Sequence, residues 1–239
     1  MIPGNVPTPA IQLRDLRFAW NGRDTIDIPQ MSVGRGERLF LQGPSGSGKS
    51  TLLGLIGGVL TPSAGDVLIL DQSLSLLSGA RRDRFRADHI GFIFQQFNLL
   101  PFLDVIENVL LPCRFSRRRA ERARVEAGSE KAQARMLLEA LDLDAEVLAK
   151  PVRELSVGQQ QRVAAARALI GSPEILIVDE PTSALDEDAR ASFLGLLIAQ
   201  CHRERSTLVF VSHDSGLATF FERKLLLREV NRVVTTAVN

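Results

Sequence analysis

The segment from residue 43 to residue 51 constrains the fold of this chain more than any other. It reads Gly43-Pro44-Ser45-Gly46-Ser47-Gly48-Lys49-Ser50-Thr51. Its glycines let the backbone wrap closely around an anion, and successive N–H groups can point inward as donors to phosphate oxygens. Lys49 can reach the outer phosphates of a nucleotide, and the Ser50 hydroxyl can ligate Mg²⁺. The segment therefore predicts a phosphate-binding loop.

The flanking residues are those that such a loop requires. Residues 37–42 are typical of a short buried strand, and residues 52–56 carry an apolar helical face. A helix beginning at the loop would also turn its positive dipole end toward the anion. The alternative, a linker rich in glycine and serine, does not explain why Lys49 and Ser50 stand in register. Strand, loop and helix together favour a nucleotide triphosphatase.

Composition sets wider limits. The 239 residues are 45% hydrophobic and 24% charged, which is typical of a globular chain with a substantial core. A net charge of +1 gives no overall field that would favour nucleic acid. Cys113 and Cys201 have no metal-ligand spacing, so free thiols are the simplest interpretation, although pairing in the fold stays open.

No apolar run approaches the ~20 residues that cross a bilayer. The first seven residues lack the basic and apolar regions of a secretory signal. We therefore expect a soluble protein whose membrane role, if it has one, goes through a partner.

The pattern of strands and helices predicts an α/β protein with a mostly parallel sheet. An N-terminal antiparallel pair is expected around a turn at Asn21-Gly22, and a helical block interrupts the alternation. Strands are predicted at 11–20, 24–28, 37–42, 66–70, 89–94, 174–178, 207–212, 223–228 and 232–236, and helices at 81–87, within 104–150, and at 159–170, 187–202 and 215–221.

A second cluster of polar groups follows the apolar run 175–178. Asp179 and Glu180 would emerge at the carboxyl end of a buried strand, where ligands of α/β sheets bind. Asp179 is suited to the Mg²⁺ shell and Glu180 to acting as a general base on water. A solvated pair of acids at a strand end is the alternative.

Two further segments could contact an anion. Ser156 can cap a helix whose first N–H groups are exposed, within Leu155-Ser156-Val157-Gly158-Gln159. His213 follows the apolar strand 207–211 and could touch a terminal phosphate. For His213 alone, a helix cap or a satisfied loop histidine is the more common role.

Together these motifs resemble the nucleotide-binding subunit of an ATP-binding cassette (ABC) transporter. They occur in the order of that family: the phosphate loop 43–51, a glutamine loop at Gln95, the signature 155–159, the second acidic motif 175–180, the loop 183–186 and the switch histidine His213. Trp20 stands 23 positions before Gly43, where the family places an aromatic ring that stacks on adenine. The resemblance spans residues 11 to about 230.

The resemblance implies a P-loop NTPase (RecA-like) core. It also implies a single domain over residues 1–239, with a loose N-terminus at 1–10, a catalytic core with a β subdomain at 11–94 and 166–239, and a helical subdomain at 95–165. Two residues depart from the family pattern. Val157 replaces the first glycine of the signature, which puts its geometry in question, and Trp20 replaces the usual tyrosine.

The resemblance also implies a set of site residues. Catalysis would rest on Glu180, His213, Lys49 and Gln95, and the metal on Ser50, Gln95 and Asp179. ATP would bind to Trp20, Gly43, Pro44, Ser45, Gly46, Ser47, Gly48, Lys49, Ser50, Thr51, Ser156, Gly158 and Gln159, with the last three acting across a head-to-tail homodimer.

Residues 91–101 and 107–112 resemble the lipoprotein-release, macrolide-efflux and cell-division subgroup. That subgroup implies a permease with a large extracytoplasmic domain, no nucleic acid, and a position at the cytoplasmic face of the inner membrane. The alternatives are a soluble ABC ATPase outside transport and an ATP-dependent regulatory module. Six arginines between residues 114 and 124 indicate either a solvated helix face or contact with anionic lipid.

Overall fold

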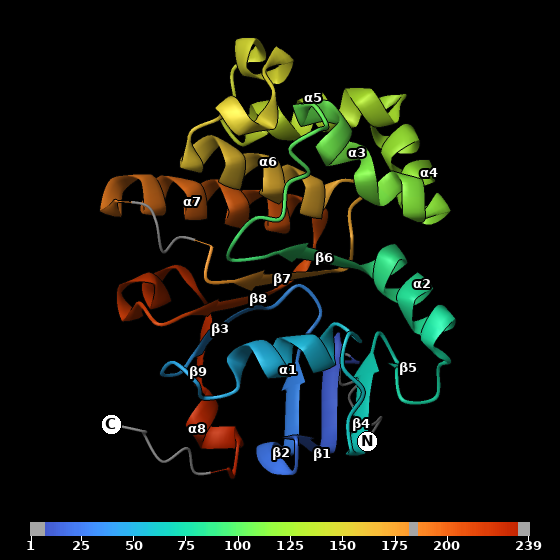
Figure 1. The fold of residues 1–239 in the computed structure, drawn as a ribbon, viewed down its shortest axis with the longest axis vertical. Coiled ribbons are helices and arrows are strands. Elements are labelled where there is room, and N and C mark those ends of the chain that lie inside the picture. Colours follow the sequence, from blue (N-terminus) through green and yellow to red (C-terminus); the bar gives the residue numbers. More distant parts are fainter. Residues whose placement is uncertain (1–7, 182–185, 234–239) are drawn as a thin grey trace, which may run out of the picture. The chain divides into compact units, whose positions relative to one another are not determined.

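The computed structural model describes residues 8–181 and 186–233 (Figure 1). The chain forms two compact units. The first unit comprises residues 1–83 and 211–239, and the second comprises residues 84–210. Within the described residues, none of the helices combines the length and apolar character that a membrane span needs.

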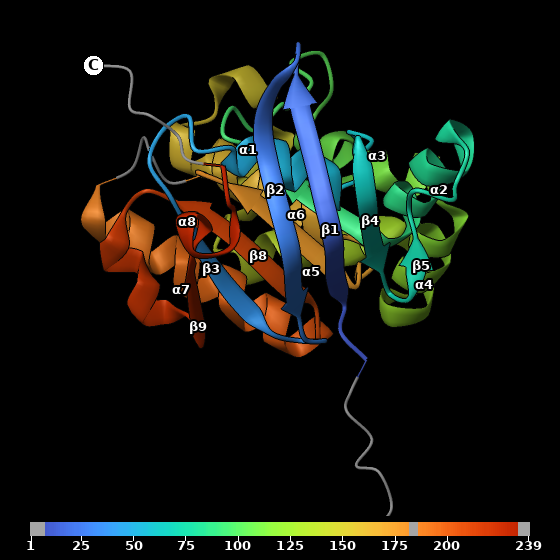
Figure 2. The ribbon, with the colours of Figure 1, turned by 90° about the horizontal axis from the view of Figure 1, so that it is seen from below.

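An antiparallel sheet forms much of the first unit. Its strands are β1 (Ile11–Trp20), β2 (Arg23–Val33), β4 (Ala64–Ile69) and β5 (Gln72–Ser73), in the order β2-β1-β4-β5. Figure 2 shows β2, β1 and β4 side by side. The turn between β1 and β2 has positive φ at both Asn21 (47°) and Gly22 (81°), the geometry that Asn-Gly favours in a two-residue hairpin. The predicted antiparallel pair and its turn are confirmed.

The predicted strand, loop and helix are also present in the first unit. Strand β3 (Arg38–Gln42) leads into the glycine loop, and helix α1 (Lys49–Ile56) follows it. Strand β9 (Arg223–Leu226) pairs with β3 in parallel, and helix α8 (Leu227–Val230) comes next. Leu39, Phe40 and Leu41 are completely buried, so hydrophobic burial fixes the strand from which the loop departs.

The second unit combines parallel strands with helices. Strand β6 (Ile90–Ile93) pairs in parallel with β7 (Ile175–Asp179), and β8 (Thr207–Ser212) is the next strand in the order, although its last two residues belong to the first unit. Helices α3 and α6 pack against each other, and Figure 1 shows them on the same side of β6 and β7. The helices are α3 (Val105–Phe115), α4 (Arg117–Ala127), α5 (Glu130–Ala140), α6 (Val157–Leu169) and α7 (Glu187–Glu204), while α2 (Gly79–His89) crosses the boundary.

Several local predictions were wrong. The helical segment expected to run to residue 150 ends at Ala140 and is followed by two 3-10 turns, Ala145–Ala149 and Val152–Glu154. Residues 215–220 form a 3-10 turn, residues 227–230 are helical, and residues 231–233 are not a strand. Ala10 is buried and bonded to β2 through Val33, so the expected loose segment 1–10 does not include it. The predicted boundaries of the helical subdomain, at 94/95 and 165/166, stay a prediction.

Cys113 and Cys201 are both buried and neither forms a disulfide bond, as the simplest interpretation of the sequence predicted. Burial raises the pKa of the Cys113 thiol to about 11. A thiol with such a pKa stays protonated near neutral pH, so Cys113 behaves as a small apolar side chain of the helical layer.

Three side chains of the arginine-rich segment make contacts within the fold. Arg119 of α4 is only 2% exposed, and its guanidinium donates to the carbonyl oxygens of Ile170 (2.7 Å) and Ala168 (2.6 Å) at the end of α6. Arg118 and Arg122 bond to Glu174, the latter at 2.8 Å. Burial excludes Arg119 from a solvated face, whereas Arg114, Arg117, Arg118 and Arg124 are exposed. Contact of the exposed arginines with anionic lipid stays a prediction.

Glu174, just before β7, contacts one histidine and two arginine side chains. His89 lies 3.0 Å from one carboxylate oxygen, and Arg118 and Arg122 donate to the other. Burial raises the pKa of Glu174, but the hydrogen bonds from His89 and Arg118 and the charges of His89 and Arg122 outweigh burial and lower the pKa to about 2. Glu174 therefore ties α2 and α4 to the strand that carries the two acids.

We predict that Glu174→Gln lowers the free energy of unfolding at pH 7 by about 3 kcal/mol. Because the folded pKa is depressed from 4.5 to about 2, the stabilisation is complete above pH 4.5 and is lost as the pH falls toward 2. Urea denaturation of both proteins across this window measures the difference. Exposed Glu139→Gln is the control and should change stability by less than about 0.5 kcal/mol. A deficit that stays constant down to pH 2 would contradict the assignment.

Candidate nucleotide site

The glycine loop has a conformation that side chains would obstruct. Gly48 has a φ of 96°, and a Cβ there would lie 3.3 Å from the carbonyl oxygen of Thr25. A Cβ on Gly43 would come within 2.6 Å of the Ser47 hydroxyl oxygen. A side chain at Gly48 would strain the backbone, and one at Gly43 would displace the Ser47 hydroxyl, so glycine is favoured at both ends of the turn.

Lys49 and Ser47 supply the polar groups inside the loop. The Lys49 ammonium is buried and donates to the carbonyl oxygens of Gly43 (2.9 Å) and Pro44 (3.0 Å). The Ser47 hydroxyl is buried and has no hydrogen-bond partner among the described residues. An unpaired buried hydroxyl costs roughly 1–3 kcal/mol, which a phosphate oxygen accepting from Ser47 would offset. The loop therefore fits a phosphate group.

Trp20 lies beside the helix that follows the loop. Its indole Nε1 donates to the Thr51 hydroxyl at 3.2 Å, and Phe18 packs edge-on with ring centroids 5.1 Å apart. The Trp20 side chain is 50% exposed, so it is not a core tryptophan. Its ring is held in place near the loop while a large part of its surface is accessible to a stacking partner.

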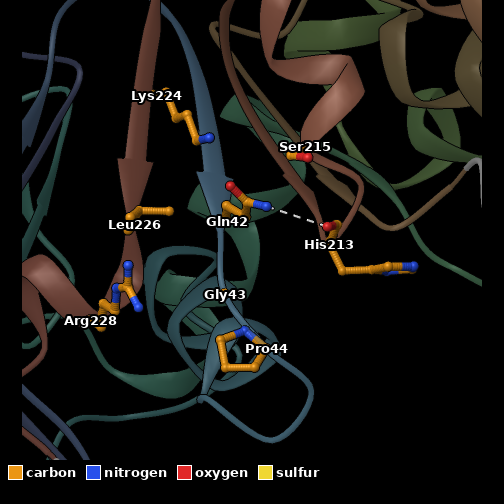
Figure 3. A pocket seen from close by; sticks show the side chains of 8 residues that line it. All are labelled: Gln42, Gly43, Pro44, His213, Ser215, Lys224, Leu226 and Arg228. Carbon is orange, nitrogen blue, oxygen red and sulfur yellow. Dashed lines mark hydrogen bonds between the residues drawn. The ribbon is translucent and has the colours of Figure 1, made fainter.

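A pocket of about 440 Å³ adjoins the loop in the first unit. It is lined by Gln42, Gly43, Pro44, His213, Ser215, Lys224, Leu226 and Arg228, which Figure 3 shows. The Gln42 amide donates to the carbonyl oxygen of His213 at 3.3 Å, while the imidazole of His213 extends away from Gln42. Two cations and no acid are among these lining residues, which favours an anionic ligand.

Asp179 is the last residue of β7 in the second unit, and Glu180 follows it directly. Glu180 has a φ of 43°, a left-handed conformation that costs roughly 1–3 kcal/mol in a non-glycine residue and is common at functional sites. The next residue, Pro181, accepts a hydrogen bond from the Gln161 amide of α6 at 3.3 Å. No sequence motif marks Gln161, so this contact could not be predicted from the sequence.

The signature begins α6. Ser156 caps the helix: its hydroxyl oxygen accepts from the Gln159 N–H at 3.2 Å, and the Gln159 side chain accepts from the Ser156 N–H at 2.9 Å. The hydroxyl proton of Ser156 can still donate to a ligand. Val157 is the first residue of the helix and is 45% exposed, so the missing glycine does not prevent the helical turn.

The remaining predicted site residues divide between the two units. The phosphate loop, Trp20 and His213 belong to the first unit, whereas Gln95, Ser156, Asp179 and Glu180 belong to the second. Gln95 is exposed in the turn after β6. Ser183, Ala184 and Leu185 of the predicted loop 183–186 lie outside the described residues.

Residues 26–183 match the family model described as ABC transporter, and the chain belongs to this family. It is an ATP-binding, ATP-hydrolysing cassette subunit that energises a separate membrane component.

Named relatives point to one branch of the family. The Lipoprotein-releasing system ATP-binding protein LolD of Xylella fastidiosa (strain Temecula1) is 42% identical over 204 residues, which cover 85% of this chain and 80% of the relative. LolD of Syntrophotalea carbinolica is also 42% identical, with 84% of this chain and 85% of the relative covered.

Solved structures of ABC cassettes agree with the assignment to this family. The ATP-binding cassette MJ0796, in a dimeric post-hydrolysis state bound to ADP and Pi, has a TM-score of 0.79 and 35% identity, with 90% of this chain and 93% of that chain covered. The cbiO1 subunit from Clostridium perfringens has a TM-score of 0.74 and 26% identity, with 91% and 84% covered. The α/β P-loop NTPase fold predicted from the sequence is confirmed.

We predict that Trp20→Ala weakens ATP binding about fivefold, because stacking on an aromatic ring contributes about 1 kcal/mol. Trp20→Phe retains a stacking face and should bind ATP within about twofold of the wild type. Trp20 is the one tryptophan of the sequence, so its emission should change during an ATP titration of the wild type. An unchanged dissociation constant in Trp20→Ala, with no change of emission in the wild type, would contradict stacking.

Proposed function

We propose that this chain hydrolyses Mg-ATP at the interface of a head-to-tail homodimer and thereby drives a permease of the lipoprotein-releasing type. The single observation that carries the nucleotide assignment is the phosphate loop, in which buried Lys49 and the unpaired Ser47 hydroxyl offer donors to an anion. The relatives that match this chain over more than four-fifths of its length support the permease class.

Each site residue has one task in this proposal. The loop N–H groups and Lys49 bind the phosphates, and Trp20 stacks on the adenine ring. Glu180 accepts a hydrogen bond from the attacking water and then its proton, and His213 stabilises charge on the terminal phosphate. The strained backbone of Glu180 supports a preorganised role for this carboxylate.

Ser50, Gln95 and Asp179 are proposed to hold Mg²⁺. A hydroxyl, an amide oxygen and a carboxylate are the hard oxygen donors that Mg²⁺ prefers, usually together with water. Bound Mg²⁺ would neutralise charge on the phosphate oxygens. Ser156, Gly158 and Gln159 are proposed to contact the terminal phosphate held by the other copy, where the Ser156 hydroxyl proton and the first N–H groups of α6 can donate.

The partner is proposed to be an integral-membrane permease with a large extracytoplasmic domain. Relatives named for a lipoprotein-releasing system suggest that the transported substrate is a lipid-anchored protein. The chain would then act at the cytoplasmic face of the inner membrane, held there by the permease. Exposed Phe94 and Phe102 in the second unit could contact the permease.

We predict that Glu180→Gln keeps ATP affinity but lowers kcat by about 10²–10⁴-fold, because the general base is lost while the binding groups remain. The variant should accumulate as an ATP-bound dimer. Steady-state ATPase assays and size-exclusion chromatography with ATP measure both effects. Glu121→Gln, which changes an exposed carboxylate on α4, is the control. Near-normal turnover in Glu180→Gln would refute the assigned role.

We predict that Lys49→Ala weakens ATP binding at least about tenfold, since charge-assisted hydrogen bonds to phosphate contribute roughly 1.5–3 kcal/mol. Isothermal titration calorimetry measures the dissociation constant. Lys131→Ala removes an exposed lysine of α5 and should leave the constant unchanged. Equal affinities in the two variants would argue against the phosphate-loop assignment.

A further inference from the structure

The turn that carries Gln95 contains strained backbone. The Phe97 N–H donates to the Phe94 carbonyl at 2.9 Å and closes the turn. Phe97 and Asn98 then both adopt left-handed conformations, with φ of 57° and 51°. Such conformations cost roughly 1–3 kcal/mol per residue and persist where surrounding contacts impose them. Some other part of the chain must therefore hold this turn.

Arg167 of α6 supplies that contact. One guanidinium nitrogen donates to the carbonyl oxygen of Asn98 at 2.7 Å, and the other donates to the carbonyl oxygen of Phe97. These acceptors are 69 and 70 residues away in the sequence. The planar guanidinium addresses two adjacent carbonyls at once, which a single-donor side chain cannot do. Burial lowers the pKa of Arg167, in keeping with its withdrawal from water.

The far side of the same loop is fixed by a different helix. Asn108 of α3 is completely buried, and its side chain accepts from the Leu100 N–H (2.8 Å) and donates to the carbonyl oxygens of Leu100 (3.1 Å) and Leu103 (3.2 Å). Asn108 thus holds the loop beyond residue 98, whereas Arg167 holds the turn next to Gln95.

The two hydrogen bonds from Arg167 to the Phe97 and Asn98 carbonyls form a clamp on the turn. Helix α6 connects this clamp to the signature and to the residues that follow β7. Arg167 stands 11 residues after Ser156 (167 − 156), so about three helical turns separate the clamp from the signature cap. Gln161 lies between them and bonds the carbonyl oxygen of Pro181, which follows Glu180. A continuous helix with hydrogen-bonded ends transmits a displacement of one end to the other.

We propose that Arg167 is the positioning residue of the glutamine loop, and that it makes the Gln95 turn move together with the signature end of α6. This inference rests on the proposed role of Gln95 at the Mg-ATP site. The new element is the route between the two sites. When Gln95 moves with its ligand, the Phe97 and Asn98 carbonyls move with it. Because Arg167 is bonded to these carbonyls, α6 moves too, and with it Ser156 at the start of the helix.

A double-mutant cycle tests the coupling. Arg167→Met, Arg167→Lys, Gln95→Ala and Arg167→Met with Gln95→Ala are compared by kcat and KM for ATP, in the full chain below the unfolding midpoint of each variant. A misplaced reacting group can cost about 10²-fold in rate, so we expect Arg167→Met to lose about 10- to 100-fold in kcat with KM within about threefold. The lysine variant, which keeps one charged donor, should recover part of the loss.

The double variant decides between positioning and support of the fold. If Arg167 acts through Gln95, the double variant is no slower than Gln95→Ala alone, within about twofold. If the two losses multiply, Arg167 supports the fold only and the inference is overturned. Should Arg167→Met fail to fold, the same cycle is run with Arg167→Lys. Wild-type kcat in Gln95→Ala would instead refute the proposed role of Gln95.

Backbone hydrogen exchange tests the clamp without any turnover. We expect residues 95–98 to exchange at least about tenfold faster in Arg167→Met than in the wild type, because opening this turn no longer breaks two charged hydrogen bonds. Arg119→Met, which loses bonds to the same end of α6 but not to this loop, should speed exchange at 168–171 and leave 95–98 unchanged. Unaltered exchange at 95–98 in Arg167→Met would overturn the inference even if activity changed.

Discussion

The second unit depends on how the two ends of α6 are satisfied. A helix leaves four N–H groups and four carbonyl groups without partners inside the helix, and buried ends must find them elsewhere. Ser156 and Gln159 close the first turn, and Arg119 donates to the carbonyls of Ala168 and Ile170 at the other end. The capped helix therefore has a defined position. This position also fixes the signature, the contact to Pro181 and the clamp on the glutamine loop.

The charge of Arg119 can be buried only because its N–H groups donate hydrogen bonds to carbonyl oxygens. An isolated buried guanidinium would cost several kcal/mol, and burial does lower the pKa of Arg119 to about 10. Two short bonds to carbonyls, and Glu174 holding Arg118 and Arg122 of the same helix, compensate that cost. Gly171 is part of this arrangement, because a Cβ there would lie 2.5 Å from the Arg119 Cβ.

Local patterns predicted what depends on neighbours in sequence. Asn21-Gly22 specified the hairpin that presents Trp20, and the glycine spacing specified the loop before α1. The roles of Arg119 and Arg167 depend on acceptors roughly 50 and 70 residues away. Charge patterning around Arg119 suggested a solvated face or contact with anionic lipid, and no local pattern marked Arg167. Residues 232 and 233, the described part of the strand predicted near 232–236, do not form a strand. A short apolar run does not by itself specify one type of secondary structure.

In the second unit, three residues with strained backbone lie next to hydrogen bonds from α6. Glu180 and the pair Phe97–Asn98 have left-handed backbone, and each stands beside a carbonyl that α6 holds, through Gln161 in one case and Arg167 in the other. Left-handed conformations at three non-glycine residues would relax in an isolated loop, because other conformations are lower in energy. Their persistence next to one helix means that the carboxylate proposed to be catalytic and the glutamine turn are constrained by a shared element. A change in either turn must then be accommodated by α6 or by breaking one of these hydrogen bonds.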